Sequence, residues 1–491
     1  MWVINKLLKK ETITESVGIM LLFTVFQKII QTVRGIVFAR LLGPSEYGIY
    51  TLAFFFIPLG ATIARLGITS CYERYTPQYE KQGELGDFFK RSYLLTIGGG
   101  ILVIVFCLFF PEQISKLLYA SAEYKNIIIL CAFTILPCVL HDNFVYSFNG
   151  LRVFKMGALM TSSQFFVFTI LGIALVIFYP KAESTILAYV VSLIIIATVF
   201  GFIIWRYIIN SNSQSLRIRG NNFYKKMFKY SIWYIISPVI FSLFNFSDRL
   251  ILNRFLGLHE VGVYSVASNV TYLLFMFGMI TGNVILPNLS KIWEQNQKDK
   301  AISMLNSAMK FSTLILLGGA VILVLFKKPI ISILYGTEYL EGISVINVLS
   351  IFWVFNSIFW IINAYGRLIE KTYFQLIGGV IGILFNIVLN YILLPRYGIL
   401  GAGIAMTISF GILLIIIFAL NHKEGMKVEL KTVLICLLLF ILLLDSVTLI
   451  FVSLILLGAI FRTELILTKE EKILFCDQLK KVVRLKKSNL I

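Results

Sequence analysis

Residues 184–208 read STILAYVVSLIIIATVFGFIIWRYI, and Arg206 is the only charged residue among them. A helix rises about 1.5 Å per residue, so this stretch is long enough to cross the roughly 30 Å hydrocarbon core of a bilayer. In the whole chain of 491 residues, 58% are hydrophobic and only 14% are charged. A soluble domain of that composition would expose large apolar patches to water. The sequence therefore predicts an integral membrane protein.

Comparable apolar runs follow one another along the whole chain. We predict an all-α integral membrane protein with about fourteen transmembrane helices and no sizeable soluble domain. The first span is longer than the apolar region of a signal peptide and shows no cleavage site, so we expect it to be retained. The predicted spans are 14–41, 46–70, 91–110, 124–149, 156–179, 184–208, 230–254, 260–286, 305–326, 342–365, 372–394, 400–421, 430–445 and 446–462.

Positive charge is unevenly distributed about these spans. The chain contains 44 Lys and Arg against 25 Asp and Glu, and its net charge is +19. Most of the basic residues fall in the two tails and in the connections on one side, including the polar loop 210–229. By the positive-inside rule, that side faces the cytoplasm. We therefore predict a multi-pass protein of the plasma (inner) membrane with both termini cytoplasmic, and we expect no nucleic acid as partner.

The chain contains an internal repeat. Residues 40–53, RLLGPSEYGIYTLA, match residues 254–267, RFLGLHEVGVYSVA, at an offset of 214 residues. Further matches follow in the same order, such as Leu118 with Leu334. Each half holds six predicted spans, an even number, so the halves enter the bilayer in the same sense as parallel repeats. We expect them to face each other across a central cavity.

The repeat divides the chain into an N-terminal lobe, a cytoplasmic linker, a C-terminal lobe, an appended pair of spans and a basic cytoplasmic tail. Within the repeat, Gly43 can end one helix, Pro44 cannot continue it, and Glu46 suits the positive N-terminus of the next. We interpret this segment as a tight turn on the outer face without contact to substrate. The predicted segments are 1–209, 210–229, 230–422, 423–462 and 463–491.

Motifs for catalysis are absent from the sequence. There is no Gly-rich loop followed by Lys-Ser/Thr, no Cys-x-x-Cys pair and no His-x-x-x-His, and the chain has only three histidines. We therefore expect no nucleotide hydrolysis, no metal centre, no cofactor and no enzymatic activity. A membrane glycan polymerase would need a large catalytic loop, and the longest candidate, about 327–342, is short. The six cysteines are expected to be small buried residues.

Five basic residues nevertheless lie within the predicted spans, namely Lys28, Arg34, Arg65, Arg249 and Lys310. A charge at the bilayer centre costs about 2.5 to 3.5 kcal/mol on insertion scales, so such residues normally face a cavity or a partner. Basic charges outnumber acidic ones here, and a cavity lined by them would attract an anion.

Two of these spans are polar on one face. Lys28, Gln31 and Arg34 recur every three residues, which places them on one broad side of a helix. Asn245, Asp248, Arg249 and Asn253 share a face in the same way. We predict a cationic substrate-binding cavity formed by Lys28, Arg34, Arg65 and Arg249, with Gln31, Asn245 and Asp248 as polar residues that line it or couple the lobes.

Alternative roles stay open for several of these residues. Asp248 and Arg249 could instead latch one lobe to the other. Lys310 and Arg65 could snorkel toward the cytoplasmic interface. His141 and the adjacent Asp142 are candidates for proton or ion coupling, and the coupling ion, Na⁺ or H⁺, is not identified by the sequence.

The sequence resembles the O-antigen-type, lipid-linked oligosaccharide flippases of the multidrug/oligosaccharidyl-lipid/polysaccharide (MOP) exporter superfamily. The resemblance covers essentially the whole chain. It is carried by ARLLGPSEYGIY at 39–50, by Asp248-Arg249 ahead of Gly257, by VGVY at 261–264 and by GILGA at 398–402.

This resemblance implies a MATE-like fold of two six-helix bundles with two further C-terminal helices. It also implies a transporter that moves a lipid-pyrophosphate-linked oligosaccharide from the cytoplasmic to the outer leaflet by alternating access, for cell-surface polysaccharide biosynthesis. The implied substrate is an undecaprenyl- or other polyprenyl-pyrophosphate-linked glycan. Membrane lipids, a glycan polymerase and glycosyltransferases are the implied partners. Arginine and lysine donors would replace the water around the pyrophosphate.

Two other functions are alternatives to a flippase. A cation-coupled drug antiporter of the same fold would favour acidic residues in its cavity, whereas basic residues predominate here. A membrane scaffold of a glycan-synthesis complex would use the basic tail 469–487 to contact anionic lipid or a partner.

Overall fold

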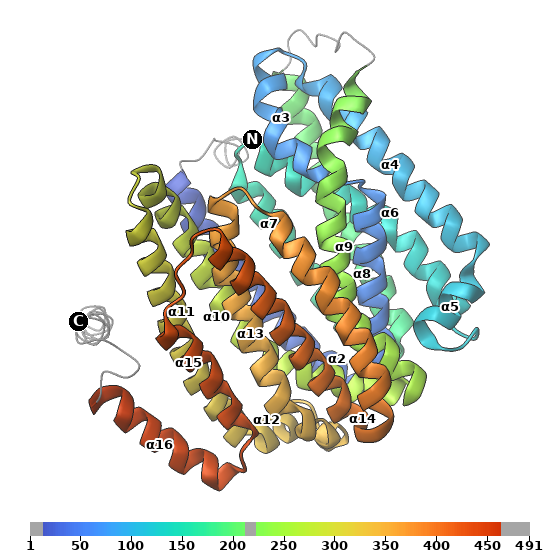
Figure 1. Cartoon of the computed structure of the whole chain (residues 1–491). Coiled ribbons are helices and arrows are strands. Elements are labelled where there is room, and N and C mark those ends of the chain that lie inside the picture. The colour runs from blue at the N-terminus through green and yellow to red at the C-terminus, as the bar shows by residue number, and fades with distance from the viewer. Residues whose placement is uncertain (1–12, 212–221, 463–491) are drawn as a thin grey trace, which may run out of the picture. The chain divides into compact units, whose positions relative to one another are not determined.

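The computed structural model describes residues 13–211 and 222–462, and these residues form helices joined by short connections, without strands (Figure 1). Ten helices in this part of the chain are long and apolar enough to cross a membrane. The prediction of an all-helical, multi-pass membrane protein is therefore confirmed. The long helices are α2 (Ile13–Ala64), α4 (Leu85–Phe109), α6 (Lys125–Gly150), α7 (Phe154–Phe178), α8 (Ala182–Ser211), α9 (Phe223–Phe255), α10 (Leu258–Glu294), α11 (Lys298–Leu325), α13 (Ile343–Leu368) and α14 (Tyr373–Lys423).

Two of these helices each join two predicted spans. Helix α2 is interrupted at Gly43, whose φ of 73° is non-helical, and α14 is interrupted at Gly398 with a φ of 56°. Glycine accepts such positive φ values without steric strain. The predicted spans 14–41 and 46–70, and likewise 372–394 and 400–421, therefore meet at glycine turns.

Shorter helices complete the described chain. Helix α5 (Pro111–Tyr119) and helix α12 (Lys327–Leu334) occupy matching places in the two copies of the repeat, and η1 (Thr337–Gly342) follows α12. The predicted spans 430–445 and 446–462 correspond to α15 (Leu430–Leu438) with η2 (Leu439–Leu443), and to α16 (Ser446–Arg462). Their apolar stretches are shorter than those of the ten long helices. The count of fourteen transmembrane helices therefore stays a prediction.

The chain packs as two compact units. The first contains the chain up to Val266 with 332–341 and 390–399, and the second contains 267–331, 342–389 and the chain from Leu400. The first unit thus includes parts of both sequence repeats, whereas the predicted lobes divide the chain at the linker 210–229. The predicted lobes follow the sequence repeat, whereas the two units follow the packing of the chain. The lobe boundaries stay a prediction.

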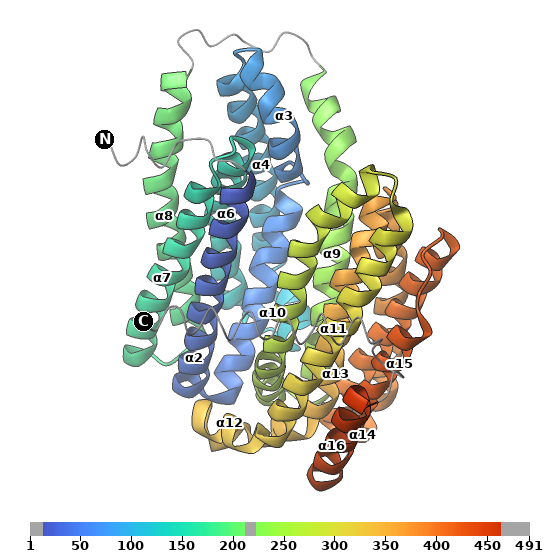
Figure 2. The same cartoon turned by 90° about the vertical axis from the view of Figure 1, so that its left-hand side faces the viewer.

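In the first unit, α2, α6, α7 and α8 run side by side and contact one another (Figure 2). Helix α3 (Thr69–Lys81) continues the chain after α2 and covers an aromatic core at one end of this unit. The stacked pair Tyr79 and Phe88, with ring centroids 4.7 Å apart, belongs to that core. The turn at Gly43 lies within α2, more than 20 residues before α3.

In the second unit, α15 is held by two buried residues of α11. Lys310 is 1% exposed, and its Nζ lies 2.7 Å from a carboxylate oxygen of Glu429, just before α15. Asn306 donates to the carbonyl of Lys427 at 2.8 Å and accepts from the N–H of Glu429 at 3.3 Å. Lys310 therefore points into an ion pair, and its possible snorkelling toward the interface stays a prediction. Among the described cysteines, four are buried and Cys436 is half-buried, and all five are free.

Candidate functional site

The carboxylate of Glu46, just after the turn at Gly43, contacts another helix. Glu46 accepts a hydrogen bond from the backbone N–H of Ala182 at 2.8 Å, so its carboxylate sits at the N-terminus of α8. A carboxylate is favourable there because the first N–H groups of a helix carry partial positive charge. The sequence correctly associated Glu46 with a helix N-terminus, but the structure shows that it also serves a second helix.

The two copies of the repeat touch each other at equivalent glycines. A Cβ atom on Gly48 would lie 2.1 Å from the carbonyl oxygen of Leu258, and one on Gly262 would lie 1.9 Å from that of Pro44. Gly48 and Gly262 are equivalent under the repeat, as are Pro44 and Leu258. The contact is therefore reciprocal, as at a two-fold axis. Only glycine permits the two backbones to approach this closely.

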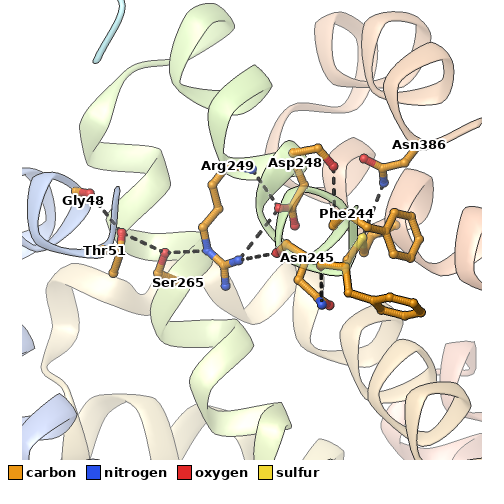
Figure 3. A network of polar contacts seen from close by, with 11 residues as sticks. Gly48, Thr51, Phe244, Asn245, Asp248, Arg249, Ser265 and Asn386 are labelled. Carbon is orange, nitrogen blue, oxygen red and sulfur yellow. Dashed lines mark hydrogen bonds and ion pairs between the residues drawn. The ribbon is translucent and has the colours of Figure 1, made fainter. Parts of the chain in front are cut away.

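A chain of polar contacts runs from this point to Arg249 (Figure 3). The Thr51 hydroxyl donates to the carbonyl of Gly48 at 2.9 Å, and the Ser265 hydroxyl donates to Thr51 at 3.4 Å. Thr51 and Ser265 are again equivalent positions of the repeat. Arg249 donates from Nε to Ser265 at 3.1 Å. The hydroxyl pair thus links the centre of the repeat contact to a buried arginine.

Arg249 is engaged by its own helix as well. Its Nη1 donates to the carbonyl of Asn245 at 2.9 Å and lies 3.8 Å from a carboxylate oxygen of Asp248. Its guanidinium also lies over the Phe246 ring, 4.7 Å from the centroid. Asn245, Asp248 and Arg249 are therefore brought together as predicted from their spacing. The printed partners of Arg249 lie on α9 and α10, in its own copy of the repeat, and Ser265 connects it to Thr51 of the other copy. The latch alternative for Asp248 and Arg249 stays a prediction.

Two side chains beside this contact bind the ends of the short helices. Arg40 donates to the carbonyls of Ile333 and Leu334, and the Nε bond to Leu334 is 2.8 Å long. Asn253 donates to the carbonyl of Leu118 at 3.1 Å. These carbonyls lie at the C-terminal ends of α12 and α5, where a helix lacks internal donors. Each copy of the repeat thus caps the short helix of the other copy.

Arg34 lies inside the first unit among aromatic rings. It is 7% exposed, and its guanidinium carbon lies 4.3 Å from the centroid of Phe168 and 5.6 Å from that of Phe165. Its Nε and Nη1 have no hydrogen-bond partner in the described part of the chain, and no carboxylate there lies within ion-pair distance. A buried cation without a counter-charge is costly, because burial removes its hydration. Arg34 therefore has donors available for an anion.

Lys28 and Gln31 precede Arg34 on α2. The Lys28 ammonium donates to the Gln31 side-chain oxygen at 3.1 Å, and both residues are half-buried. The neighbouring Gln27 donates to the Ser162 hydroxyl of α7 at 2.9 Å. The predicted polar face of this helix thus borders α7.

Arg65, Asp142 and His141 form a third group within the first unit. Arg65 makes an ion pair with Asp142 and donates to the Thr62 hydroxyl at 3.0 Å. His141 Nδ1 lies 3.2 Å from Asp142, and His141 Nε2 is buried without a hydrogen-bond partner among the described residues. The sequence singled out all three residues but did not pair Arg65 with Asp142. This pairing joins Arg65 to α6 and places a negative charge beside its guanidinium. The snorkelling alternative for Arg65 stays a prediction.

The sequence interpretation assigned no role in a site to five residues on the repeat contact, namely Arg40, Gly48, Thr51, Gly262 and Ser265. The signal was present, because all five belong to the two repeated segments 40–53 and 254–267. What was lacking was the knowledge that the repeated segments touch each other. In the described residues, no group of three or more His, Cys, Asp or Glu side chains is arranged to hold a metal ion.

Comparisons with known proteins give a consistent assignment. A sequence model of the family described as "Polysaccharide biosynthesis protein" matches residues 37–344. A putative O-antigen transporter of Shigella flexneri is 24% identical over 386 residues, which cover 75% of this chain and 88% of that protein.

Two solved structures share the fold. The lipid II flippase MurJ, in an inward closed conformation, aligns with a TM-score of 0.69 at 20% identity over 90% of this chain and 98% of that chain. An inward-facing multidrug resistance MATE family transporter of the MOP superfamily aligns with a TM-score of 0.62 at 14% identity, over 83% of this chain and 98% of that one. The predicted MATE-like fold is confirmed by these two structures.

Proposed function

Because the chain belongs to the polysaccharide biosynthesis protein family, we propose that it is a flippase that moves a lipid-pyrophosphate-linked oligosaccharide from the cytoplasmic to the outer leaflet by alternating access. The relatives named above are transporters by their descriptions, which supports a role in transport rather than catalysis. The substrate and the direction are our proposal. The lipid carrier would be a polyprenyl pyrophosphate, whose tail can remain in the bilayer while the head group crosses.

The observation that carries this proposal is the buried, uncompensated guanidinium of Arg34. A pyrophosphate keeps its negative charge during transport, so its water must be replaced by other donors. Arg34 offers Nε and Nη1, which have no partner among the described residues. The cation–π contact with Phe168 holds the guanidinium without using its N–H groups. Such a group is prepared for an anionic ligand and would be poorly placed for a cationic one.

The repeat contact supports alternating access. It joins the two copies of the repeat beside the Gly43 turn of α2, through glycine backbones, one hydroxyl pair and capped carbonyls. These are hydrogen bonds and backbone contacts, so the contact can separate at modest cost and reform in each cycle. We infer that this contact is the gate at the outer side.

The group Arg65, Asp142 and His141 is our candidate for ion coupling. Protonation of Asp142, or Na⁺ binding to it, would remove the negative charge that neutralises Arg65. Arg65 would then become available to the pyrophosphate. The same acidic residue favours the second candidate function, a cation-coupled antiporter of drugs or other small molecules. Efflux of cationic dyes by cells that express the chain, unaffected by substitution of Arg34, would support that second function.

The proposal is tested with Arg34→Ala and Arg34→Lys in proteoliposomes that contain a fluorescent polyprenyl-pyrophosphate oligosaccharide. We expect Arg34→Ala to reduce the flipping rate by roughly tenfold to a hundredfold, because one charge-assisted contact to a buried anion is worth roughly 1.5 to 3 kcal/mol. Arg34→Lys should retain part of the activity. Arg396→Ala, which removes an exposed arginine, is the matched control. Wild-type flipping by Arg34→Ala at normal protein levels would contradict the anion-binding role.

A further inference from the structure

Helix α13 is buried along almost its whole length, and the exceptions include two tryptophans that lie seven residues apart. Between Val345 and Gly366 only three residues have side chains that are not buried. One of them, Asn347, is engaged with Lys327 and with the carbonyl of Leu442. The other two are Trp353 and Trp360, and the next residue of the same spacing is Arg367, which is half-buried. Residues seven apart lie on the same face of a helix.

Aromatic residues of α10 pack against these tryptophans, within the same compact unit. Trp353 meets the Tyr272 ring edge to face at 4.7 Å and the Phe275 ring at 5.6 Å. Phe275 also meets Trp360 at 6.1 Å. Tyr272 and Phe275 are themselves half-buried. We call Tyr272, Phe275, Trp353, Trp360 and Arg367 the aromatic stripe.

The backbone of α10 makes room for this arrangement. A Cβ atom on Gly282 would lie 2.5 Å from Cδ1 of Trp360, so any larger residue there would displace the indole ring. The Trp360 Nε1–H donates to the side-chain oxygen of Asn283 at 3.3 Å. Trp360 is therefore held in position by a glycine below its ring and an amide at its edge.

Two donors in the stripe are unused. Trp353 Nε1 and Arg367 Nε are buried and have no hydrogen-bond partner in the part of the chain that the structure describes. Leaving a buried donor unsatisfied costs about 1 to 3 kcal/mol. Trp353 is also far from both ends of α13, so it is not one of the interfacial tryptophans that mark the edges of a membrane. These features indicate a ligand with hydrogen-bond acceptors.

Sugar rings fit this combination of groups. One face of a pyranose presents C–H groups that pack on an aromatic ring, while its hydroxyl and acetamido oxygens accept from N–H donors around the ring. Binding sites for polar organic ligands combine apolar surface with a few placed polar groups in this way. An acyl chain could cover the rings but would leave the Trp353 and Arg367 donors unsatisfied.

We propose that the aromatic stripe binds the sugar residues of the transported glycan, with Trp353 and Trp360 as stacking surfaces and Trp353 Nε1 and Arg367 Nε as donors to sugar oxygens. This inference rests on the proposed function and extends it. Arg34 would hold the pyrophosphate, whereas the stripe would recognise the glycan. Successive rings about ten ångströms apart along the helix, from the 1.5 Å rise over seven residues, match the length of a disaccharide.

The test compares two ligands on the purified full chain in nanodiscs. One is a polyprenyl pyrophosphate that carries a disaccharide, and the other is the same polyprenyl pyrophosphate without sugar. We expect Trp353→Ala and Trp360→Ala each to weaken binding of the glycolipid by roughly threefold to tenfold, as for the loss of one ring contact. Binding of the sugar-free lipid should be unchanged. Trp360→Phe should restore part of the affinity, and Trp205→Ala, at an exposed tryptophan of α8, is the matched control.

The possible outcomes separate the two proposals. If the wild-type chain binds both lipids and the tryptophan variants bind the glycolipid equally well, the stripe has no role in glycan recognition and the flippase proposal stands. If the variants lose both lipids equally, the stripe is structural and this inference is overturned. If the wild-type chain binds neither lipid, the proposed function fails and the stripe proposal fails with it.

Discussion

At the scale of single residues, Gly48 and Gly262 explain why the repeated motif is the same in both halves. Each glycine lies against a backbone carbonyl of the other copy, which no side chain could do. The motif was interpreted from the sequence as a tight turn. The turn exists, but the glycine two residues after Glu46 is required by the carbonyl of Leu258, far away in the chain.

Gly48→Ala should therefore weaken the repeat contact. The added methyl group would lie 2.1 Å from the Leu258 carbonyl, and overpacking of this kind costs about 1 to 3 kcal/mol. We expect a lower melting temperature of the purified protein and faster maleimide labelling of a cysteine introduced at Thr51. Gly98→Ala is the control, because no atom lies within 4 Å of the position of its Cβ. Equal melting temperatures for the two variants would show that the contact does not bear on stability.

At the scale of elements, α2 and α10 are joined by a hydroxyl pair at equivalent positions. The Thr51 and Ser265 oxygens are 3.4 Å apart, and Arg249 donates a hydrogen bond to Ser265. If this contact is a gate, α2 and α10 must separate there during each transport cycle. A covalent bond between them would arrest the cycle.

The paired variant Thr51→Cys/Ser265→Cys tests the gate. Oxidation should form a disulfide and stop flipping, and a reducing agent should restore it, since the constraint is then removed. The native cysteines in the described chain are free and mostly buried, so they should compete little for oxidation. Each single-cysteine variant serves as a control and should be insensitive to the oxidant. Full activity of the oxidised, cross-linked pair would mean that these helices stay together throughout transport.

At the scale of the whole molecule, the ion coupling that we propose requires that an ion gradient and substrate movement depend on each other. The ion pair of Arg65 with Asp142 is suited to this, because a proton or Na⁺ on Asp142 changes the charge available to an anionic substrate. The His141 ring beside Asp142 offers a second titratable group.

Asp142→Asn should uncouple transport from the gradient. The variant keeps the size of the side chain but lacks the negative charge, so Arg65 would be permanently without its partner. In proteoliposomes with an imposed proton or Na⁺ gradient, we expect the stimulation of flipping by the gradient to fall by about tenfold, in the usual range of coupling energies. Glu112→Gln, at an exposed ion pair with Lys125, is the control. Gradient stimulation equal to that of the wild type would remove Asp142 from the coupling site.

Several features of this protein follow from the sequence by itself. The apolar runs, the glycine turns between them, the repeat and the intramembrane charges depend on residues close together in the chain. The helical periodicity also placed Asn245, Asp248 and Arg249 on one face, as the structure shows.

Only the tertiary structure decided which distant residues meet. Arg65 pairs with Asp142, Lys310 pairs with Glu429, and the glycines of the two repeats pack on each other's carbonyls. The sequence does not distinguish Trp353 and Trp360 from other apolar residues, whereas the structure shows that they are less buried than most of α13. The physical reason is that local pattern determines which side chains share a face of a helix. The helix that covers that face is chosen by packing between segments far apart in sequence.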